Sequence, residues 1–303
     1  MDLRHLELLR GLAERGSVTA VAAATHRTPS AVSQQLRTAQ REAGVPLVEP
    51  AGRGLRLTEA GHLLAAGGVQ VAEALARVQA QWDEFRGGPS GTVSIATLPS
   101  AATFLLPGVL RDLADSTIDI TCVDVDIAEA EFAALTADHD IVIAHSLTSV
   151  RPAGTEGLRV VPLAREPLDI AMAADHRLAD RATLRPADLV DCHWIGVPRG
   201  FPFDTVLQAI EQATGADLRV VQRLRDNRLI EALVADSDQV AVLPRFTTPT
   251  GGGLVLRELS GLRPARHVTA VLRPDRAERL AVRRVVQALK RSGETVVAEL
   301  VRD

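Results

Sequence analysis

Five polar residues recur at a spacing that would place them on one face of a helix. They are Ser30, Ser33, Gln34, Arg37 and Arg41, and none of them is acidic. Positions three, four, seven and eleven residues apart lie on one side of a helix, because each turn takes 3.6 residues. Hydroxyls, amides and guanidiniums contact phosphate oxygens, while Gln and Arg also pair with the edges of adenine and guanine. This face therefore predicts binding to double-stranded DNA.

The segment 17–44 would hold this face in place as two short helices around a tight turn. Ser17 is suited to cap the first helix, whose alanine-rich sequence allows close packing. Thr28 is the predicted cap of the second helix, and Pro29 occupies its first position, where a missing N–H costs nothing. Val32 would point inward, away from the polar face. An ordinary helical hairpin is the alternative interpretation.

The flanking segments complete a small N-terminal unit. Residues 3–15 predict a first helix with leucines on its inner side, and Gly16 ends it. Residues 46–57 predict a two-stranded wing. Arg53 stands at the tip of that hairpin between two glycines, where it would reach the minor groove or a phosphate. A solvated turn residue is the alternative interpretation of Arg53.

Several short motifs occur in an order, and at separations, that resemble the N-terminal domain of the LysR-type transcriptional regulators. They are Gly16-Ser17, Pro29-Ser30-Ala31-Val32-Ser33, Glu42-Ala43-Gly44 and Leu57-Thr58-Glu59-Ala60-Gly61. The resemblance runs through residue 86 and implies a winged helix-turn-helix at 1–58, with 29–43 as recognition helix. It also implies a homodimer or homotetramer on an inverted-repeat operator. The predicted DNA contacts are Thr28, Ser30, Ser33, Gln34, Arg37, Arg41 and Arg53.

Two departures from the family pattern lie near the wing. Ala39-Gln40 stands where the family usually has Leu-Glu, and Leu47-Val48-Glu49-Pro50 stands where it has Leu-Phe-x-Arg. The missing arginine and the added Glu49 predict a weaker contact to the DNA backbone at this point, with the mode of binding unchanged.

Residues 59–86 predict one long helix with an apolar stripe, capped by Thr58. The stripe consists of Leu64, Val71, Leu75, Val78, Trp82 and Phe85, and from Val71 onward it follows heptad spacing. A helix with such a stripe must bury it, which predicts pairing with the same helix of a second chain. A core helix packed within its own chain is the alternative. Gly67-Gly68 predicts either a close helix crossing or a bend.

After a hinge at 87–91 the pattern changes to alternating strands and helices, which predicts an α/β domain with a largely parallel sheet at 92–303. The predicted strands are 92–97, 118–125, 140–145, 159–163, 168–173, 193–197, 218–224, 239–243, 254–259 and 267–273. The predicted helices are 101–114, 128–137, 186–190, 203–214, 227–235 and 276–300. The family resemblance, weaker here, implies a two-lobed effector domain like a periplasmic binding protein. Its first lobe would comprise 92–163 and 268–303, and its second lobe 164–267.

Ligands of open α/β sheets bind beyond the carboxyl ends of the strands, and in a two-lobed protein they bind between the lobes. The resemblance places the effector contacts at such strand ends. They are Thr97, Ser100, His145, Arg199, Phe201 and Asn227. A helix N-terminus together with Arg199 would favour a carboxylate-bearing metabolite. Alternatively, Thr97 and Ser100 only cap a helix, His145 is a satisfied polar residue, and Arg199 is a surface charge.

Composition narrows the class of protein. The 303 residues suit two or three domains, and no apolar run approaches a membrane span, so we expect a cytoplasmic protein. Cys122 and Cys192 are expected to be buried free thiols, and no Cys/His set has metal-ligand spacing, so neither a metal nor a cofactor is expected. Residues 1–57 hold eight arginines and five acids, a charge of +3, whereas the remainder carries 26 basic and 33 acidic residues, a charge of −7. The basic charge thus lies with the predicted DNA-binding unit.

The sequence therefore predicts a transcriptional regulator whose operator binding responds to a small molecule between two lobes. No nucleophile elbow, zinc-protease, P-loop or dinucleotide-binding motif is present, so no catalytic residues and no enzyme are expected. The alternative is a ligand-independent DNA-binding protein whose C-terminal region serves as an oligomerisation scaffold.

Overall fold

The computed structural model describes residues 2–52 and 54–300. The chain forms two compact units. The first consists of Met1–Gly88 together with Arg273–Leu280, and the second consists of Pro89–Leu272 together with Ala281–Asp303. Among the described helices, none combines the length and the apolar character that a membrane span requires.

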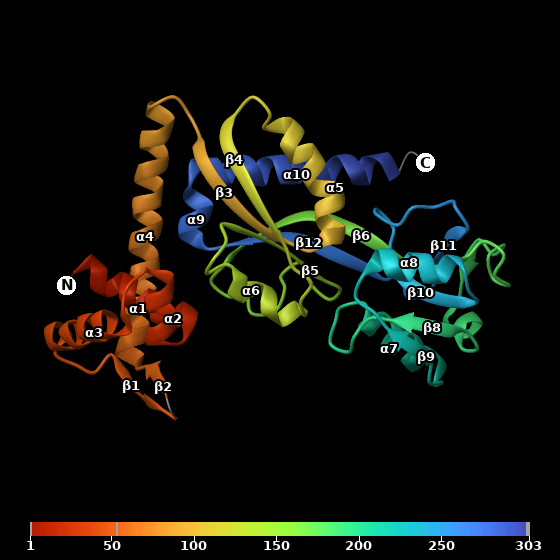
Figure 1. Cartoon of the computed structure of the whole chain (residues 1–303), viewed down its shortest axis with the longest axis horizontal. Helices are drawn as coiled ribbons and strands as arrows, with labels where there is room; N and C mark the ends of the chain where they lie inside the picture. The colour runs from red at the N-terminus through yellow and green to blue at the C-terminus, as the bar shows by residue number, and fades with distance from the viewer. Residues whose placement is uncertain (1, 53, 301–303) are drawn as a thin grey trace. The chain divides into compact units, whose positions relative to one another are not determined.

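The first unit is a helix-turn-helix with a wing and a long helix (Figure 1). Its elements are α1 (Leu3–Arg15), α2 (Val18–Ala24), α3 (Pro29–Ala43), β1 (Val48–Ala51), β2 (Gly54–Leu57) and α4 (Glu59–Phe85). The predicted caps form. The hydroxyl oxygens of Ser17, Thr28 and Thr58 accept hydrogen bonds from the N–H groups three residues further on, at 3.1, 3.2 and 3.1 Å. Each cap satisfies a donor that the first helical turn leaves free.

Helices α1, α2 and α3 enclose an aliphatic core. Leu9 and Val32 are fully buried, and Val21, Leu36 and Ala39 are nearly so. Half-buried Leu64 of α4 packs against the same cluster. The prediction that Leu64 belongs to the apolar stripe of α4 is therefore wrong, because the end of α4 that carries it is covered by the unit's own core.

The double glycine in α4 marks a close helix crossing. A Cβ atom at Gly68 would lie 2.6 Å from the carbonyl oxygen of Leu6 in α1, whereas a Cβ atom at Gly67 would meet nothing within 4 Å. Of the two predicted explanations, the crossing therefore accounts for Gly68, and Gly67 faces open space.

These adjacent glycines give a matched pair of variants. We expect Gly68→Ala to lower the free energy of unfolding by about 1–3 kcal/mol, because the new methyl group must displace the α1 backbone. Gly67→Ala should instead raise it by up to about 1 kcal/mol, since alanine is the better helix former. Thermal unfolding of both variants beside the unmodified chain measures the difference. Equal effects of the two substitutions would contradict the crossing.

A short segment from late in the chain completes the first unit. Helix α9 (Pro274–Glu278) packs along α4, and the buried guanidinium of Arg273 lies 2.9 Å from the Glu14 carboxylate of α1. Asp275 pairs with Arg273 at 2.6 Å and with Arg10 of α1 at 3.2 Å. Burial would raise the pKa of Asp275, but these arginines hold it below its usual value. The sequence predicts this segment to belong to the first lobe, whereas its contacts group it with the N-terminal unit.

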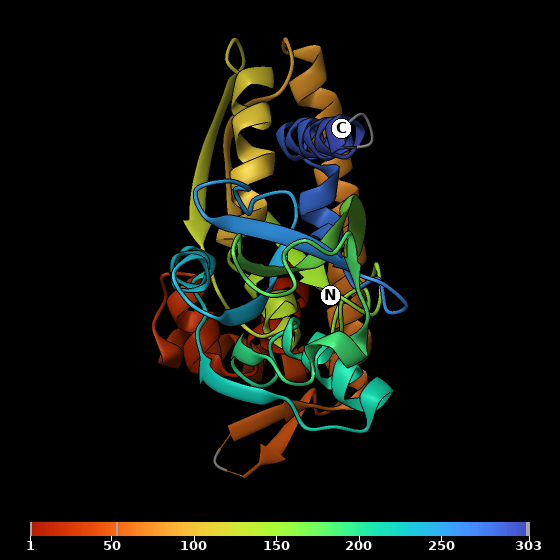
Figure 2. The same cartoon turned by 90° about the vertical axis from the view of Figure 1, so that its right-hand side faces the viewer.

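The second unit contains a sheet that runs through two lobes, as Figures 1 and 2 show. Its strands are β3 (Ser90–Thr97), β4 (Thr117–Asp124), β5 (Ile141–Ser146), β6 (Arg159–Ala173), β7 (Thr183–Leu184), β8 (His193–Gly196), β9 (Arg219–Arg223), β10 (Gln239–Pro244), β11 (Leu254–Leu259) and β12 (Ala265–Leu272). The main strand order is β4-β3-β5-β12-β6-β10-β8-β9. Pairs β3/β4, β3/β5, β8/β9 and β8/β10 are parallel, but β12 and β6 run antiparallel to their neighbours. The sheet is therefore mixed.

Strand β6 joins the two lobes. Its first part pairs with β12, and its second part pairs with β10 and β11. The two predicted strands 159–163 and 168–173 are thus one continuous strand, because Ala164–Pro167 keep pairing with β12 across the junction.

The helices of the second unit are α5 (Pro99–Asp112), α6 (Phe132–Leu135), α7 (Asp204–Thr214), α8 (Asn227–Ala235) and α10 (Leu280–Leu300). Helices α5 and α10 lie side by side in both views, and a Cβ atom at Gly108 would lie 2.2 Å from the hydroxyl oxygen of Ser292. Three of the predicted helices differ from what the structure shows. Segment 128–137 is a 3-10 turn followed by short α6, 186–190 is a 3-10 turn, and 276–300 breaks at extended Arg279. Strand β7 was not predicted.

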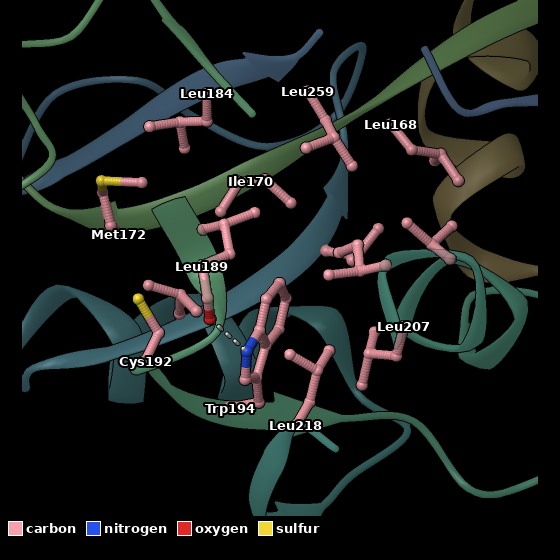
Figure 3. Packing of buried hydrophobic residues seen from close by; sticks show 14 of the residues in the cluster. Leu168, Ile170, Met172, Leu184, Leu189, Cys192, Trp194, Leu207, Leu218 and Leu259 are labelled. Atoms are coloured by element: carbon pink, nitrogen blue, oxygen red, sulfur yellow. Dashed lines mark hydrogen bonds between the residues drawn. The ribbon is translucent and has the colours of Figure 1, made fainter. Parts of the chain in front are cut away.

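The core of the second lobe surrounds Trp194 of β8 (Figure 3). Its ring is fully buried among leucines, and its indole N–H donates to the carbonyl oxygen of Leu189 at 3.3 Å. Cys192 is also buried in this cluster. Cys122, in contrast, is exposed, because β4 is an edge strand of the sheet. The prediction of a buried thiol is therefore wrong for Cys122.

Candidate nucleic-acid interface and ligand pocket

The outer face of α3 carries the side chains that the sequence analysis assigned to DNA. Ser30, Gln34, Arg37 and Arg41 are exposed, as is the capping residue Thr28, and Ser33 is half-buried. Gln34, Arg37 and Arg41 together line a shallow groove that continues to Pro46. Within residues 2–52 and 54–300, Gln34 and Arg37 make no hydrogen bond or ion pair, so their polar ends are free for a partner. Arg53 lies outside the described residues.

The opposite sides of α3 are fixed by two glutamines. Gln35 donates from its amide nitrogen to the carbonyl oxygen of Arg4 at 2.7 Å, which ties α3 to the start of α1. The side-chain oxygen of Gln40 accepts from the N–H groups of Leu47 at 2.9 Å and Val48 at 3.3 Å. One of the departures from the family pattern, Gln40, thus positions the first strand of the wing. Sequence reasoning missed this role.

In the wing, Glu49 faces Arg56 across the hairpin. The two residues are partners in the antiparallel register, and the guanidinium nitrogen lies 2.8 Å from the carboxylate oxygen. Because both side chains are well exposed, the pair contributes little to stability. It does balance the negative charge of Glu49 locally, which reduces the repulsion of DNA phosphates that this residue would otherwise cause.

An apolar stripe runs along α4 beyond the core of the first unit. Its side chains are exposed to the extent of 37% for Val71, 64% for Leu75, 61% for Val78, 52% for Trp82 and 81% for Phe85. The rings of Trp82 and Phe85 stack with centroids 5.6 Å apart. Five large apolar side chains at heptad spacing on one exposed helix form a seam that a partner helix would cover.

A cavity of about 550 Å³ lies within the second unit, at the ends of strands from both lobes. Four of the six predicted effector contacts line it, namely Ser100, His145, Phe201 and Asn227. Its volume falls in the range of small-molecule sites. The structure thus brings these four predicted residues together at one cavity.

Thr97 and Arg199 do not line this cavity. Thr97 is fully buried as the last residue of β3, and its hydroxyl group donates to the carbonyl oxygen of Leu98 at 3.2 Å. Arg199 is exposed in the turn before Gly200, whose φ is 86°. The structure therefore does not support these two residues as pocket contacts.

A buried ion pair forms one wall of the cavity. Arg266 of β12 is 1% exposed and Glu166 of β6 is fully buried, and the Nε of Arg266 donates to Glu166 at 2.6 Å. Nη1 of Arg266 donates to the hydroxyl oxygen of Ser100 at 2.9 Å, and the backbone N–H of Phe246 donates to Glu166 at 2.8 Å. Burial raises the pKa of Glu166, an effect that Arg266 partly offsets. Sequence reasoning missed both members of the pair.

His145 lies at the centre of an aromatic cluster in the same wall. Its ring meets Phe132 and Phe203 edge to face, with centroids 5.7 and 6.0 Å away. Burial, together with the nearby charge of Arg266, lowers the pKa of His145 well below its usual value. The imidazole is therefore neutral at physiological pH, and its Nδ1 is buried without a hydrogen-bond partner among the described residues.

The mouth of the cavity carries charges of both signs. Arg225 lies over the ring of Phe201 at 5.1 Å, and Asp126, Asp226 and Arg228 are also exposed at the rim. Burial raises the pKa of Asp126, although Arg225 works against it. The cavity thus combines a mainly apolar interior, with the half-buried side chain of Glu231 on its wall, and a charged mouth. Across residues 2–52 and 54–300, no cluster of three or more His, Cys, Asp or Glu side chains could hold a metal ion.

Comparisons with known proteins match both parts of the chain. A family model for the LysR substrate binding domain matches residues 86–294, and one for bacterial regulatory helix-turn-helix proteins of the lysR family matches residues 3–62. The DNA-binding transcriptional dual regulator OxyR of Escherichia coli strain K12 is 25% identical over 296 residues, which cover 96% of this chain and 95% of OxyR.

Two solved structures show the same fold. A mutant of Corynebacterium glutamicum OxyR with bound hydrogen peroxide has a TM-score of 0.59 at 20% identity, covering 98% of this chain and 94% of its own. Full-length CbnR in complex with its target DNA has a TM-score of 0.52 at 21% identity, covering 97% of this chain and 100% of its own.

Proposed function

Because this chain belongs to the LysR family of DNA-binding transcriptional regulators, we propose that the outer face of α3 binds its operator and that a small molecule in the pocket controls this binding. The single observation that carries the first part is the row of exposed Gln34, Arg37 and Arg41 along one groove. The observation that supports the second part is a cavity that both lobes line.

The exposed seam of α4 supports a homodimer as the DNA-binding form. Two such helices, one from each chain, would bury the seam of each against the other. A two-fold dimer presents two copies of α3, so the operator should be an inverted repeat with half-sites about one helical turn apart. A homotetramer of two dimers is the larger assembly we propose. Since its target is the chromosome, we place the protein in the cytoplasm.

Ligand binding would act by shifting the equilibrium between open and closed lobes. A ligand that contacts both lobes stabilises the closed arrangement in proportion to its differential affinity. The first turn of α5 has no side-chain cap, because its N-cap residue is Leu98. Pro99 has no N–H and Ala101 donates to the carbonyl oxygen of Leu98 at 3.1 Å, which leaves the N–H of Ser100 as the donor that an anion could meet at this helix start. This supports a carboxylate-bearing effector held near Ser100.

The positions of the two cysteines argue against peroxide sensing through a disulfide within this chain. Cys122 lies on β4 and Cys192 directly precedes β8, six strands away in the sheet order. At about 4.8 Å per strand this separation is roughly 29 Å, whereas a disulfide needs Cα atoms within about 7 Å. Peroxide sensing through an internal disulfide is therefore not proposed for this chain. Membership of a regulator family likewise supports a protein that is not an enzyme.

The DNA-binding face can be tested on an operator selected from random duplexes by the full-length protein. We expect Gln34→Ala or Arg37→Ala each to cost about 1–3 kcal/mol in operator binding and to relax the base preference at one position of the half-site. Arg219→Ala removes an exposed arginine from β9 and should leave the affinity unchanged. Gel-shift titrations at fixed salt measure the difference. Unchanged operator affinity in both α3 variants would refute the assigned face.

The alternative function, a DNA-binding protein whose second unit is only a scaffold, differs in one measurable way. It predicts that no small molecule shifts either operator affinity or the melting temperature of the second unit. Screening organic acids by thermal shift therefore discriminates between the two functions.

A further inference from the structure

Gln40 lies where helix α3 passes into the wing. It belongs to the last turn of α3, shortly before the loop at 44–47 that leads to β1 (Figure 1). Its side-chain oxygen accepts from the backbone N–H groups of Leu47 and Val48 at 2.9 and 3.3 Å. This one side chain thus joins the helix to the start of the wing.

The two backbone donors determine how the Gln40 amide is oriented. Of the two polar atoms of an amide group, only the oxygen accepts from N–H groups, so the oxygen faces Leu47 and Val48 and the nitrogen is left for another partner. Over the part of the chain that the structure describes, no acceptor takes a hydrogen from this nitrogen. It is therefore a donor of fixed orientation that the fold of the protein does not use.

Gln40 also lines the shallow groove at the outer face of α3. Arg37, Thr38 and Arg41 line the same groove, which continues to Pro46, and none of the described residues that line it is acidic. The Thr38 hydroxyl oxygen accepts from Nη2 of Arg41 at 3.1 Å, which restricts the position of that guanidinium. Two positive charges and an unused amide donor form a surface that suits an anion.

The dimensions of DNA indicate which anion this is. Successive residues of a helix rise by 1.5 Å, so Gln40 lies about 15 Å along α3 from Ser30, whereas the major groove is about 12 Å wide. When the first half of a recognition helix contacts base edges, its last turn therefore reaches the sugar-phosphate strand beside the groove. A wing that enters the adjacent minor groove lies across the same strand. The junction of helix and wing consequently faces phosphates.

We propose that Gln40 is a further DNA-binding residue, whose amide nitrogen donates to a phosphate of the strand that passes between α3 and the wing. The amide oxygen meanwhile keeps the wing attached to α3, so one side chain makes the contact and supports it. This inference rests on the proposed operator binding by α3. It distinguishes a phosphate contact at the end of the helix from the base contacts of Gln34 and Arg37.

Replacing Gln40 by glutamate separates its two roles. A carboxylate still accepts from Leu47 and Val48, but it cannot donate to a phosphate and repels it. We expect Gln40→Glu to lower affinity roughly 10–100-fold, equally on the selected operator and on random duplexes, while the melting temperature is maintained. Gln70→Glu adds the same charge at an exposed position of α4 and should change the affinity less than about threefold. Gel shifts of the full-length protein at fixed salt measure both variants.

Methylphosphonate groups test the contact from the side of the DNA. Introduced one at a time along the half-site, each removes the charge of a single phosphate. We expect one position at which this change weakens binding by the unmodified protein but restores binding by Gln40→Glu, because the repulsion is lost. If Gln40→Glu fails to fold, Gln40→Met replaces it, and a methylphosphonate at that position should not weaken this variant further.

Two results would overturn the inference. One is a Gln40→Glu variant that folds and binds the operator as tightly as the unmodified protein, and the other is an operator on which no methylphosphonate position distinguishes the variant from the unmodified chain. In both cases the unmodified protein still binds its operator, so the proposed function stands. If random duplexes yield no operator at all, the proposed function fails together with this inference.

Discussion

Replacing Glu166 by glutamine is expected to lower the free energy of unfolding of the second unit by about 3–5 kcal/mol. The substitution keeps the shape of the side chain but removes the charge that balances Arg266. Arg266 is 1% exposed, so water cannot replace the lost carboxylate. An unpaired charge in such a place costs far more than the pair itself contributes, because desolvation is no longer offset.

A solvent-exposed pair in the same unit provides the control. Arg291 of α10 and Asp112 of α5 lie 2.9 Å apart, but their side chains are 45% and 38% exposed. Asp112→Asn should therefore cost no more than about 1 kcal/mol. Urea unfolding is followed by the fluorescence of buried Trp194 in a Trp82→Phe background, which leaves a single tryptophan. A cost for Glu166→Gln as small as that for Asp112→Asn would show that water reaches the buried pair.

Removing both charges shows whether the stability is lost because a buried charge has no partner or because packing is disturbed. Glu166→Leu combined with Arg266→Met should restore most of the lost stability, since replacing a buried ion pair by apolar groups is often neutral or stabilising. The double variant would also open the pocket wall, because Ser100 loses the hydrogen bond from Arg266. A double variant as unstable as the single one would indicate that packing, and not charge, is the reason for the loss.

Local patterns predicted the DNA-binding unit well. The caps Ser17, Thr28 and Thr58 and the polar face of α3 depend on residues within a few turns of each other, so their geometry follows from the sequence alone. For Leu64 the local pattern was not sufficient. It continues the stripe of α4 by spacing, but α4 meets the core of the helix-turn-helix at that end, and only the tertiary fold decides which neighbour covers it.

The sequence predicted several residues that line the pocket, but neither member of the buried ion pair in its wall. Ser100, His145 and Asn227 stand at the ends of strands or the starts of helices, which a coarse assignment of elements locates. Arg266 and Glu166 are 100 residues apart in the sequence and meet because β12 pairs with β6. No local pattern indicates that pairing. An arginine near the start of a strand that ends in the apolar residues Ala270-Val271-Leu272 was the one available signal.

Replacing Trp82 by aspartate is expected to split the dimer and to lower operator affinity by about 10²–10⁴-fold. Trp82 is 52% exposed near the C-terminal end of the α4 seam and stacks on Phe85, so pairing with a second chain would bury it in the interface. A carboxylate at this position would have to lose its water without gaining a partner. Once separated, each chain binds a half-site alone and loses the high effective concentration that linkage gives the second α3.

Sedimentation measures the mass of the full-length variant at micromolar concentration, and gel shifts on a two-half-site operator measure affinity. Trp82→Phe keeps an aromatic ring and should retain both the mass and the affinity of the unmodified chain. Both readouts depend on dimerisation. Operator binding by the aspartate variant should therefore recover when the protein concentration approaches the raised dissociation constant of its dimer. An aspartate variant that sediments with the unmodified mass would show that the exposed seam of α4 is covered by something other than its own counterpart.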